Sequence, residues 1–258
     1  MTTVLEVRGL SKCFTLHLRG GLELPVLHEV SLRVDAGECV ALTGASGRGK
    51  STLVKCLFGS YGADAGTVWL AASAGRIDIA AASAQQMLRL RRSDIAYVSQ
   101  FLRAVPRVSA LDIVAERLLQ ARPQESVRSG AGEVALDDVD AGATEAARRG
   151  ARVLLLRLNL PASLHALPPA TFSGGEQQRV NVARGFIQPA RLLLLDEPTA
   201  SLDAANRAVV VALIGEAKAR GTAVVGIFHD DEVRAAVADR CVELHSAAVG
   251  ATGHQELP

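Results

Sequence analysis

Residues 44–52, with the sequence GASGRGKST, have the types and spacing needed to hold a chain of phosphates. They fit the pattern Gly, four residues, Gly, Lys, Ser/Thr, in which glycines let the backbone curl and point successive N–H groups inward. Those donors, with the positive end of a following helix, bind a polyphosphate. We expect Lys50 to reach its β- and γ-phosphates and the Ser51 hydroxyl to ligate Mg²⁺. The predicted phosphate-binding residues are Gly44, Ala45, Ser46, Gly47, Arg48, Gly49, Lys50, Ser51 and Thr52.

The elements around this loop are those that a phosphate-binding loop requires. The apolar run 39–42 predicts a strand that enters the loop, and residues 53–58 predict a helix that leaves it. With strand, loop and helix in this order, a chance Gly/Ser-rich turn is the weaker interpretation. After residue 38 strands and helices alternate, which predicts an α/β fold with a mostly parallel sheet and helices on both faces.

Polar residues that could do chemistry also follow the ends of three other predicted strands. These residues, each with its strand, are Gln100 (95–98), Asp196 and Glu197 (192–195), and His229 (222–228). Ligands of parallel α/β sheets bind beyond the carboxyl ends of the strands, so one pocket would explain all of these signals. Taken singly, each also fits a structural role, as a loop amide, a solvated strand end or a hydrogen-bonded histidine.

The chemistry of these residues suits hydrolysis of a triphosphate. Asp196 can hold Mg²⁺ beside the Ser51 hydroxyl, and Glu197 can orient or deprotonate the attacking water. Gln100 can contact the metal or the water, and His229 can hydrogen-bond the γ-phosphate. We therefore predict the catalytic residues to be Glu197, His229 and Gln100, and the metal ligands to be Ser51, Gln100 and Asp196.

A second anion site is predicted at Ser173, Gly174, Gly175 and Glu176, which open a helix over residues 175–187. One triphosphate does not need two such sites on distant segments. The economical explanation is a site completed by another subunit, so that Ser173 binds the nucleotide held by the partner's phosphate loop. An ordinary serine N-cap followed by glycines is the alternative.

The rest of the chain predicts a β-rich lobe and a helical region. Alternating residues in 4–18 and the resumed pattern in 24–34 predict antiparallel strands joined by a hairpin. Residues 122–142 predict a poorly ordered or locally helical insertion. The helix predicted over 144–158 has its apolar side formed by Val153, Leu154, Leu156 and Leu158. The last ten residues are predicted to fray.

Composition narrows the class of protein. The net charge of +1 argues against a strongly basic nucleic-acid surface, and 3% aromatic residues argue against base-stacking platforms. We therefore expect no nucleic-acid partner. No apolar run approaches the ~18 residues of a membrane helix, so we also expect no direct membrane insertion and a cytoplasmic location. The four cysteines lack metal-ligand spacing and are predicted to be reduced; they are Cys13, Cys39, Cys56 and Cys241.

The ordered motifs resemble those of the ABC-family ATPases over nearly the whole chain. They are the phosphate loop 44–52, Gln100, the signature 173–177, the strand and acids 192–197, the segment 201–203 and His229. The resemblance implies ATP and Mg²⁺ as cofactors and a head-to-tail dimer, homomeric or heteromeric, with two ATP molecules at an interface that includes Ser173, Gly175 and Asp203. It also implies that Phe14 stacks on adenine.

The family's fold implies one ABC ATPase domain over residues 1–258. Segments 1–100 and 188–258 would form the β lobe and a RecA-like core, and 101–187 would form the helical subdomain with the signature.

A narrower resemblance favours one client. Stretches 98–110, 171–186 and 226–230 resemble the L-type ATPase subunits of the bacterial carbon–phosphorus lyase system. This implies a soluble ATPase that assists or remodels the lyase complex in phosphonate catabolism, with the lyase core subunits as partners. The alternatives are the nucleotide-binding subunit of a membrane transporter of the lipoprotein or macrolide-export type, and a nucleotide sensor with little turnover.

Overall fold

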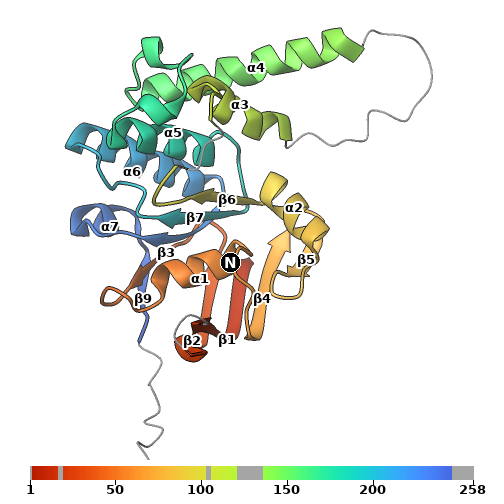
Figure 1. Ribbon diagram of the computed structural model, residues 1–258, viewed down its shortest axis with the longest axis vertical. Coiled ribbons are helices and arrows are strands. Elements are labelled where there is room, and N and C mark those ends of the chain that lie inside the picture. The colour runs from red at the N-terminus through yellow and green to blue at the C-terminus, as the bar shows by residue number, and fades with distance from the viewer. Residues whose placement is uncertain (1, 17–19, 103–105, 121–135, 246–258) are drawn as a thin grey trace, which may run out of the picture.

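The computed structural model describes residues 2–16, 20–102, 106–120 and 136–245. These residues form two sheets with helices around them (Figure 1). The antiparallel sheet has the strand order β2-β1-β4-β5 and consists of β1 (Thr3–Leu16), β2 (Leu22–Asp35), β4 (Ala65–Ala72) and β5 (Gly75–Asp78). The parallel sheet has the order β6-β7-β8-β3-β9 and consists of β3 (Cys39–Thr43), β6 (Ile95–Val98), β7 (Leu192–Asp196), β8 (Ala223–Ile227) and β9 (Arg240–Glu243).

The helices connect the strands, and several of them cover the parallel sheet. They are α1 (Lys50–Leu57), α2 (Ala84–Ser93), α3 (Ala110–Gln120), α4 (Leu136–Arg157), α5 (Gly174–Phe186), α6 (Ala204–Ala219) and α7 (Asp231–Val237). Two short 3-10 turns, Ala162–Leu164 and Pro169–Thr171, lie between α4 and α5. The predicted parallel sheet, antiparallel lobe and helical region are all confirmed.

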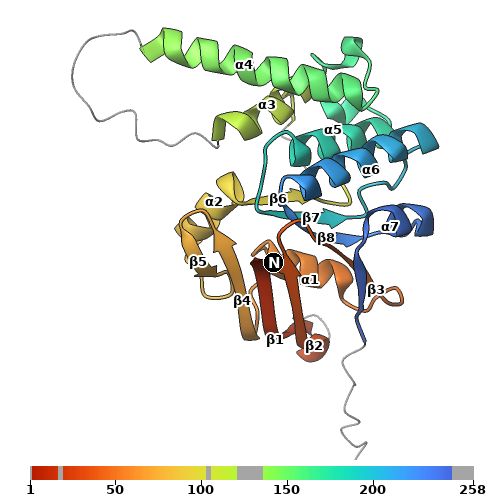
Figure 2. The same ribbon diagram turned by 180° about the vertical axis from the view of Figure 1, so that it is seen from behind.

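Alternate residues of the parallel strands face two different cores. Leu193 and Leu195 of β7 pack with α5 and α6, whereas Leu192 and Leu194 pack with α1 and the antiparallel sheet. All four side chains are buried, as expected for strands covered on both faces. Figures 1 and 2 show the result, with α1 and α5 on opposite sides of the parallel sheet.

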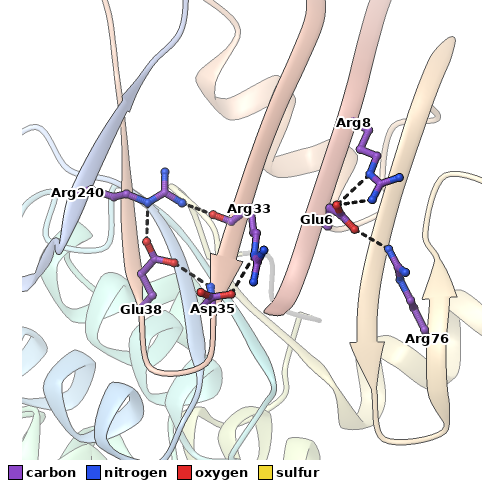
Figure 3. A network of polar contacts seen from close by, with 7 residues as sticks. All are labelled: Glu6, Arg8, Arg33, Asp35, Glu38, Arg76 and Arg240. Carbon is purple, nitrogen blue, oxygen red and sulfur yellow. Dashed lines mark hydrogen bonds and ion pairs between the residues drawn. The ribbon is translucent and has the colours of Figure 1, made fainter. Parts of the chain in front are cut away.

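Two groups of polar contacts join the strands near the N-terminus to neighbouring segments (Figure 3). The Arg240 guanidinium of β9 donates to the Glu38 carboxylate and to the backbone carbonyl of Arg33 in β2. A second group joins Glu6 of β1 to Arg8 and to Arg76 of β5. An exposed ion pair contributes at most about 1 kcal/mol to the free energy of folding, so these contacts align the strands more than they stabilise the protein.

Helix α4 differs from its prediction in both length and buried face. It begins at Leu136, so residues 136–142 of the predicted insertion are helical, whereas residues 121–135 and the predicted frayed end lie outside the described residues. The predicted apolar side is wrong for Val153 and Leu156, which are 68% and 49% exposed. Within residues 141–157 of α4, the buried side chains follow a spacing of four and are Ala143, Ala147, Ala151 and Leu155. Alanine has little apolar area and gives a weak pattern, yet it lets α3 and α4 approach closely.

Candidate functional site

The phosphate loop lies between β3 and α1, and two of its glycines are required by its shape. Gly44 has φ 122°, and a Cβ there would lie 2.7 Å from the Leu244 carbonyl oxygen. Gly49 has φ 84°, and its Cβ would lie 2.9 Å from the Val26 carbonyl oxygen. A side chain at either position would both strain the backbone and collide with main-chain atoms.

The phosphate loop is lined by the ammonium group of Lys50 and by the backbone N–H groups at the start of α1. The Lys50 ammonium donates to the carbonyl oxygens of Gly44 at 2.7 Å and Ala45 at 3.0 Å. Gly49 is the N-cap of α1 and supplies no side-chain acceptor to the first N–H groups of the helix. Those unsatisfied donors and the helix dipole make this end of α1 suitable for phosphate.

Asp196, at the end of β7, meets the phosphate loop through Ser51. The Ser51 hydroxyl donates to Asp196 Oδ1 at 3.0 Å, and the Tyr97 hydroxyl lies 3.4 Å from Oδ2. Burial raises the pKa of Asp196, against the lowering effect of the Ser51 hydrogen bond. Ionising this carboxylate is therefore costly unless a cation lies beside it.

The donor set fits Mg²⁺. Ser51 and Asp196 offer a hydroxyl and a carboxylate oxygen, the hard ligands that Mg²⁺ prefers. Within residues 2–16, 20–102, 106–120 and 136–245, no three His, Cys, Asp or Glu side chains cluster as a metal cage. Such a sparse set suits an ion that keeps its waters and binds mainly through substrate phosphates.

Glu197 connects two of the other strand ends. Its Oε1 lies 2.7 Å from His229 Nε2, after β8, and its Oε2 accepts a hydrogen bond from Gln100 Nε2, after β6, at 3.3 Å. The Glu197 backbone has φ 56°, an uncommon conformation for a residue with a side chain. The structure thus brings Gln100, Glu197 and His229 into contact and sets Asp196 against Ser51; their chemical roles stay predictions.

Phe14 forms part of an aromatic pair that the sequence did not reveal. Its ring lies 5.3 Å from the Tyr61 ring in an edge-on arrangement, with the Lys12 ammonium 5.4 Å from the Phe14 centroid. Tyr61 follows the turn after α1, and nothing in the local pattern distinguishes it from a core residue. A base stacked on Phe14, as predicted, would have Tyr61 supporting the ring from the side.

The predicted signature does not meet the phosphate loop of the same chain. Ser173 caps α5 and forms a reciprocal pair with Glu176, whose pKa is lowered by the hydrogen bonds from Ser173. α1 and α5 belong to different cores on opposite faces of the parallel sheet. Gly175 lies against the Ser201 carbonyl, since a Cβ there would be 2.8 Å from that oxygen.

The remaining predicted residues have local roles in the structure. Asp203 caps α6 by accepting a hydrogen bond from the Asn206 backbone N–H at 2.8 Å. Arg48 is partly buried at the loop, and its backbone N–H donates to the Ala45 carbonyl at 3.4 Å.

A groove of about 490 Å³ adjoins the catalytic residues between α1, α2, α3 and α5. Its described lining includes Gln100 and Asp196 at the catalytic end, and the arginines Arg91, Arg92, Arg117 and Arg184 further along. Burial lowers the pKa of Arg117 to about 10, and the positive charge of Arg184 adds to this effect. The sequence did not single out these arginines because they are distributed over three helices.

The comparisons with known proteins identify the chain's relatives. The sequence model of the family described as ABC transporter matches residues 27–200. The lipoprotein-releasing system ATP-binding protein LolD of Shewanella denitrificans is 35% identical over 245 residues, covering 94% of this chain and 93% of LolD.

Two further relatives are longer proteins. The pyoverdine export ATP-binding/permease protein PvdT of Pseudomonas putida is 37% identical over 253 residues, covering 96% of this chain and 34% of PvdT. The macrolide export ATP-binding/permease protein MacB of Escherichia coli is 33% identical over 244 residues, with 95% and 33% covered. The chain therefore spans about a third of the length of these two relatives.

A solved structure supports the fold. The dimeric, post-hydrolysis ATP-binding cassette MJ0796 bound to ADP and Pi has a TM-score of 0.77 at 24% identity, covering 93% of this chain and 94% of MJ0796. These findings confirm an ABC-type P-loop NTPase fold.

The carbon–phosphorus lyase interpretation is wrong. LolD, MacB and PvdT are ATP-binding components of export or release systems, which matches the transporter alternative. The physical reason for the error is that stretches 171–186 and 226–230 contain the predicted signature and His229, which belong to the nucleotide-binding machinery. Residues that bind and hydrolyse nucleotide are shared across the family and carry little information about the client.

The findings establish the chemistry and the family. No described helix is both long and apolar enough to cross a bilayer. The chain is an ATPase, and it binds ATP with Mg²⁺. It belongs to the ABC transporter family.

Proposed function

We propose that this chain is the ATP-hydrolysing cassette of an ABC transporter of the export or release type. The observation that carries the proposal is its 35% identity with LolD along 93% of the length of that ATP-binding protein. The similarity to PvdT and MacB, which combine such a cassette with a permease, supports the same class.

Hydrolysis follows from the arrangement at the ends of the parallel strands. The phosphate loop and Lys50 hold the phosphates of ATP, and Glu197 orients a water for in-line attack on the γ-phosphorus. Glu197 accepts the proton of that water while the bond to the bridging oxygen breaks and ADP leaves. Ser51 and Asp196 would hold Mg²⁺, which would supply positive charge to the phosphate oxygens. His229 and Gln100 hold the Glu197 carboxylate in place from two sides.

A second cassette completes the site. Ser173, Gly174 and Gly175 present the N-terminus of α5, yet they lie on the other face of the parallel sheet from their own phosphate loop. We infer that they bind the ATP held by a partner cassette, with Asp203 near the same interface. This accounts for two anion-binding helix ends in one chain.

The groove beside Gln100 is proposed to receive a permease segment. Phe101 and Leu88 line it and are 73% and 50% exposed, an unusual position for large apolar side chains. The guanidinium groups of Arg91 and Arg117 donate to backbone carbonyls, and Asp196 is the one carboxylate among the groove's described lining residues. A helix with apolar and acidic side chains is complementary to this surface.

A co-purification experiment tests the proposal. Tagged Glu197→Gln protein, loaded with Mg-ATP, is recovered from detergent-solubilised membranes and its partners are identified by mass spectrometry. We expect a permease that is retained by this protein and lost with Arg92→Glu. Arg89→Glu, an exposed charge reversal on α2 outside the groove lining, is the matched control. Retention of soluble proteins alone contradicts the proposal.

A further inference from the structure

Two buried amide side chains of α5 reach the backbone of the catalytic edge. Gln178 and Asn181 are only 4% and 3% exposed. The Gln178 amide nitrogen donates to the Pro198 carbonyl at 3.0 Å and lies 3.4 Å from the Glu197 carbonyl. The Asn181 amide nitrogen donates to the Ser99 carbonyl at 2.5 Å. One helix therefore contacts the backbone of both segments that carry the Glu197–Gln100 pair.

The Glu197 segment requires such support because its backbone is strained. Its φ of 56° places a side-chain-bearing residue in the left-handed region. Strained conformations persist only where several surrounding contacts fix them. Here the Glu197 N–H donates to the Ile227 carbonyl, the Ala200 N–H donates to the Glu197 carbonyl, and Gln178 adds a side-chain donor.

Asn181 acts at the other half of the pair. It holds the Ser99 carbonyl, one residue before Gln100, whose amide nitrogen lies 3.3 Å from Glu197 Oε2. Asn181 also lies 3.5 Å from the Gln178 side-chain oxygen, so the two amides are neighbours on the same turn of α5. The spacing between Glu197 and Gln100 therefore depends on α5.

We propose that Gln178, supported by Asn181, is a positioning residue for ATP hydrolysis. It fixes the backbone turn that directs the Glu197 carboxylate toward the attacking water and does not itself contact the nucleotide. The inference rests on the proposed role of Glu197. It also makes α5 a direct physical connection between the Ser173 end, proposed to face the partner's nucleotide, and the base of its own site.

Replacing Gln178 with methionine, which has a similar shape but no amide, tests the inference. Turnover (kcat) of Mg-ATP should fall about tenfold, the effect of losing one ordinary hydrogen bond, while KM changes little. Gln188→Met is the matched control, because Gln188 also donates to a backbone carbonyl, that of Arg92 at 3.1 Å, but lies beyond the far end of α5. Gln188→Met should keep the wild-type kcat.

Gln178→Glu separates positioning from packing. An ionised carboxylate cannot donate to the Pro198 carbonyl, whereas a protonated one donates through its O–H. The kcat of Gln178→Glu relative to wild type should therefore rise as pH is lowered from 8 to 6, while the same ratio for Gln178→Met stays constant.

Several results would contradict a positioning role for Gln178. Wild-type kcat in Gln178→Met, an equal loss in Gln188→Met, or a flat pH ratio for Gln178→Glu overturns it. If Gln178→Met does not fold, the pH ratio of Gln178→Glu decides alone. Undiminished turnover in Glu197→Gln instead removes the proposed base, a failure distinct from that of Gln178.

Discussion

The catalytic edge of the parallel sheet and the neighbouring groove share Gln100 and Asp196 but differ in how their polar groups are satisfied. At the edge, Glu197 contacts His229 and Gln100, and Asp196 contacts Ser51. In the groove, the guanidinium groups of Arg91 and Arg117 donate to uncharged backbone carbonyls, and Phe101 is largely exposed. The edge holds its reactive groups in mutual contact, whereas the groove presents charge and apolar surface outward. We therefore expect the position of the Glu197 carboxylate to depend on contacts within the chain, and the choice of permease to depend on a surface that needs a partner.

The largest expected effect is at the edge. Glu197→Gln should reduce ATP turnover about 10²–10⁴-fold, because an amide cannot accept the proton of the attacking water. ATP binding should persist. Phosphate release measures the loss of hydrolysis, and nucleotide affinity, measured on the same variant, checks that binding is retained. With Mg-ATP the variant should also migrate as a dimer on size exclusion. Rapid hydrolysis by this variant would show that another group is the base.

Lys50→Ala should separate binding from chemistry within the edge. The variant loses a charge-assisted contact to the phosphates, and we expect its ATP affinity to fall about 10–100-fold. Isothermal titration measures this loss. Arg48→Ala, which removes a positive charge two residues away in the same loop, is the comparison that shows how much of the loss is long-range charge. Unchanged ATP affinity in Lys50→Ala would refute the loop assignment.

Arg92→Glu should affect the groove and spare the edge. ATP turnover of the isolated protein should stay near the wild-type rate, because the Glu197 carboxylate contacts His229 and Gln100, whereas Arg92 lies on α2 in the groove lining. Affinity for the permease should fall about tenfold or more, since the substitution reverses a charge in the docking surface. Arg89→Glu should change neither quantity. Equal permease binding by both variants would exclude the groove as the docking site.

The smallest effect concerns stability. Burial raises the pKa of Asp196, so the folded protein binds a proton more readily than the unfolded chain. Stability therefore falls as pH rises from the ordinary aspartate pKa through the raised folded value, and above it the full cost of the buried charge is present. Asp196→Asn should melt a few degrees higher than wild type at pH 7.5, since each kcal/mol is worth about 2–4 °C in a protein of this size.

Calorimetry across pH checks this expectation. The melting advantage of Asp196→Asn should shrink as pH falls toward the ordinary aspartate value. The exposed Glu23→Gln serves as the control and should show no such trend. A melting temperature for Asp196→Asn below wild type at pH 7.5 would mean that the hydrogen bonds of the carboxylate outweigh its burial.

Much of the fold was predictable because strong local patterns carry it. The run of leucines in β7 and the loop between β3 and α1 each specify an element by short-range signals. Strand ends then fixed where Gln100, Glu197 and His229 would meet, since parallel strands share one edge. The face of α4 was not predictable, because its buried positions are alanines and its longer apolar side chains, Val153 and Leu156, lie outside.

The client was mispredicted for a related reason. The motor residues form an ordered set of motifs that many ABC ATPases share. The groove arginines come from α2, α3 and α5, so no sequence window displays them together. Likewise, Gln178 contacts the Glu197 turn about twenty positions further along the chain. This contact depends on how α5 packs against the end of β7, which local sequence patterns do not reveal.

The decisive measurement is the rate of ATP turnover by the purified complex of this chain with the permease recovered by co-purification. We predict that the permease changes the turnover of the wild-type cassette and of Arg89→Glu, while the turnover of Arg92→Glu stays at the rate of the isolated chain. Identical turnover with and without the permease in all three proteins would contradict the proposal that this cassette drives a transporter through the groove.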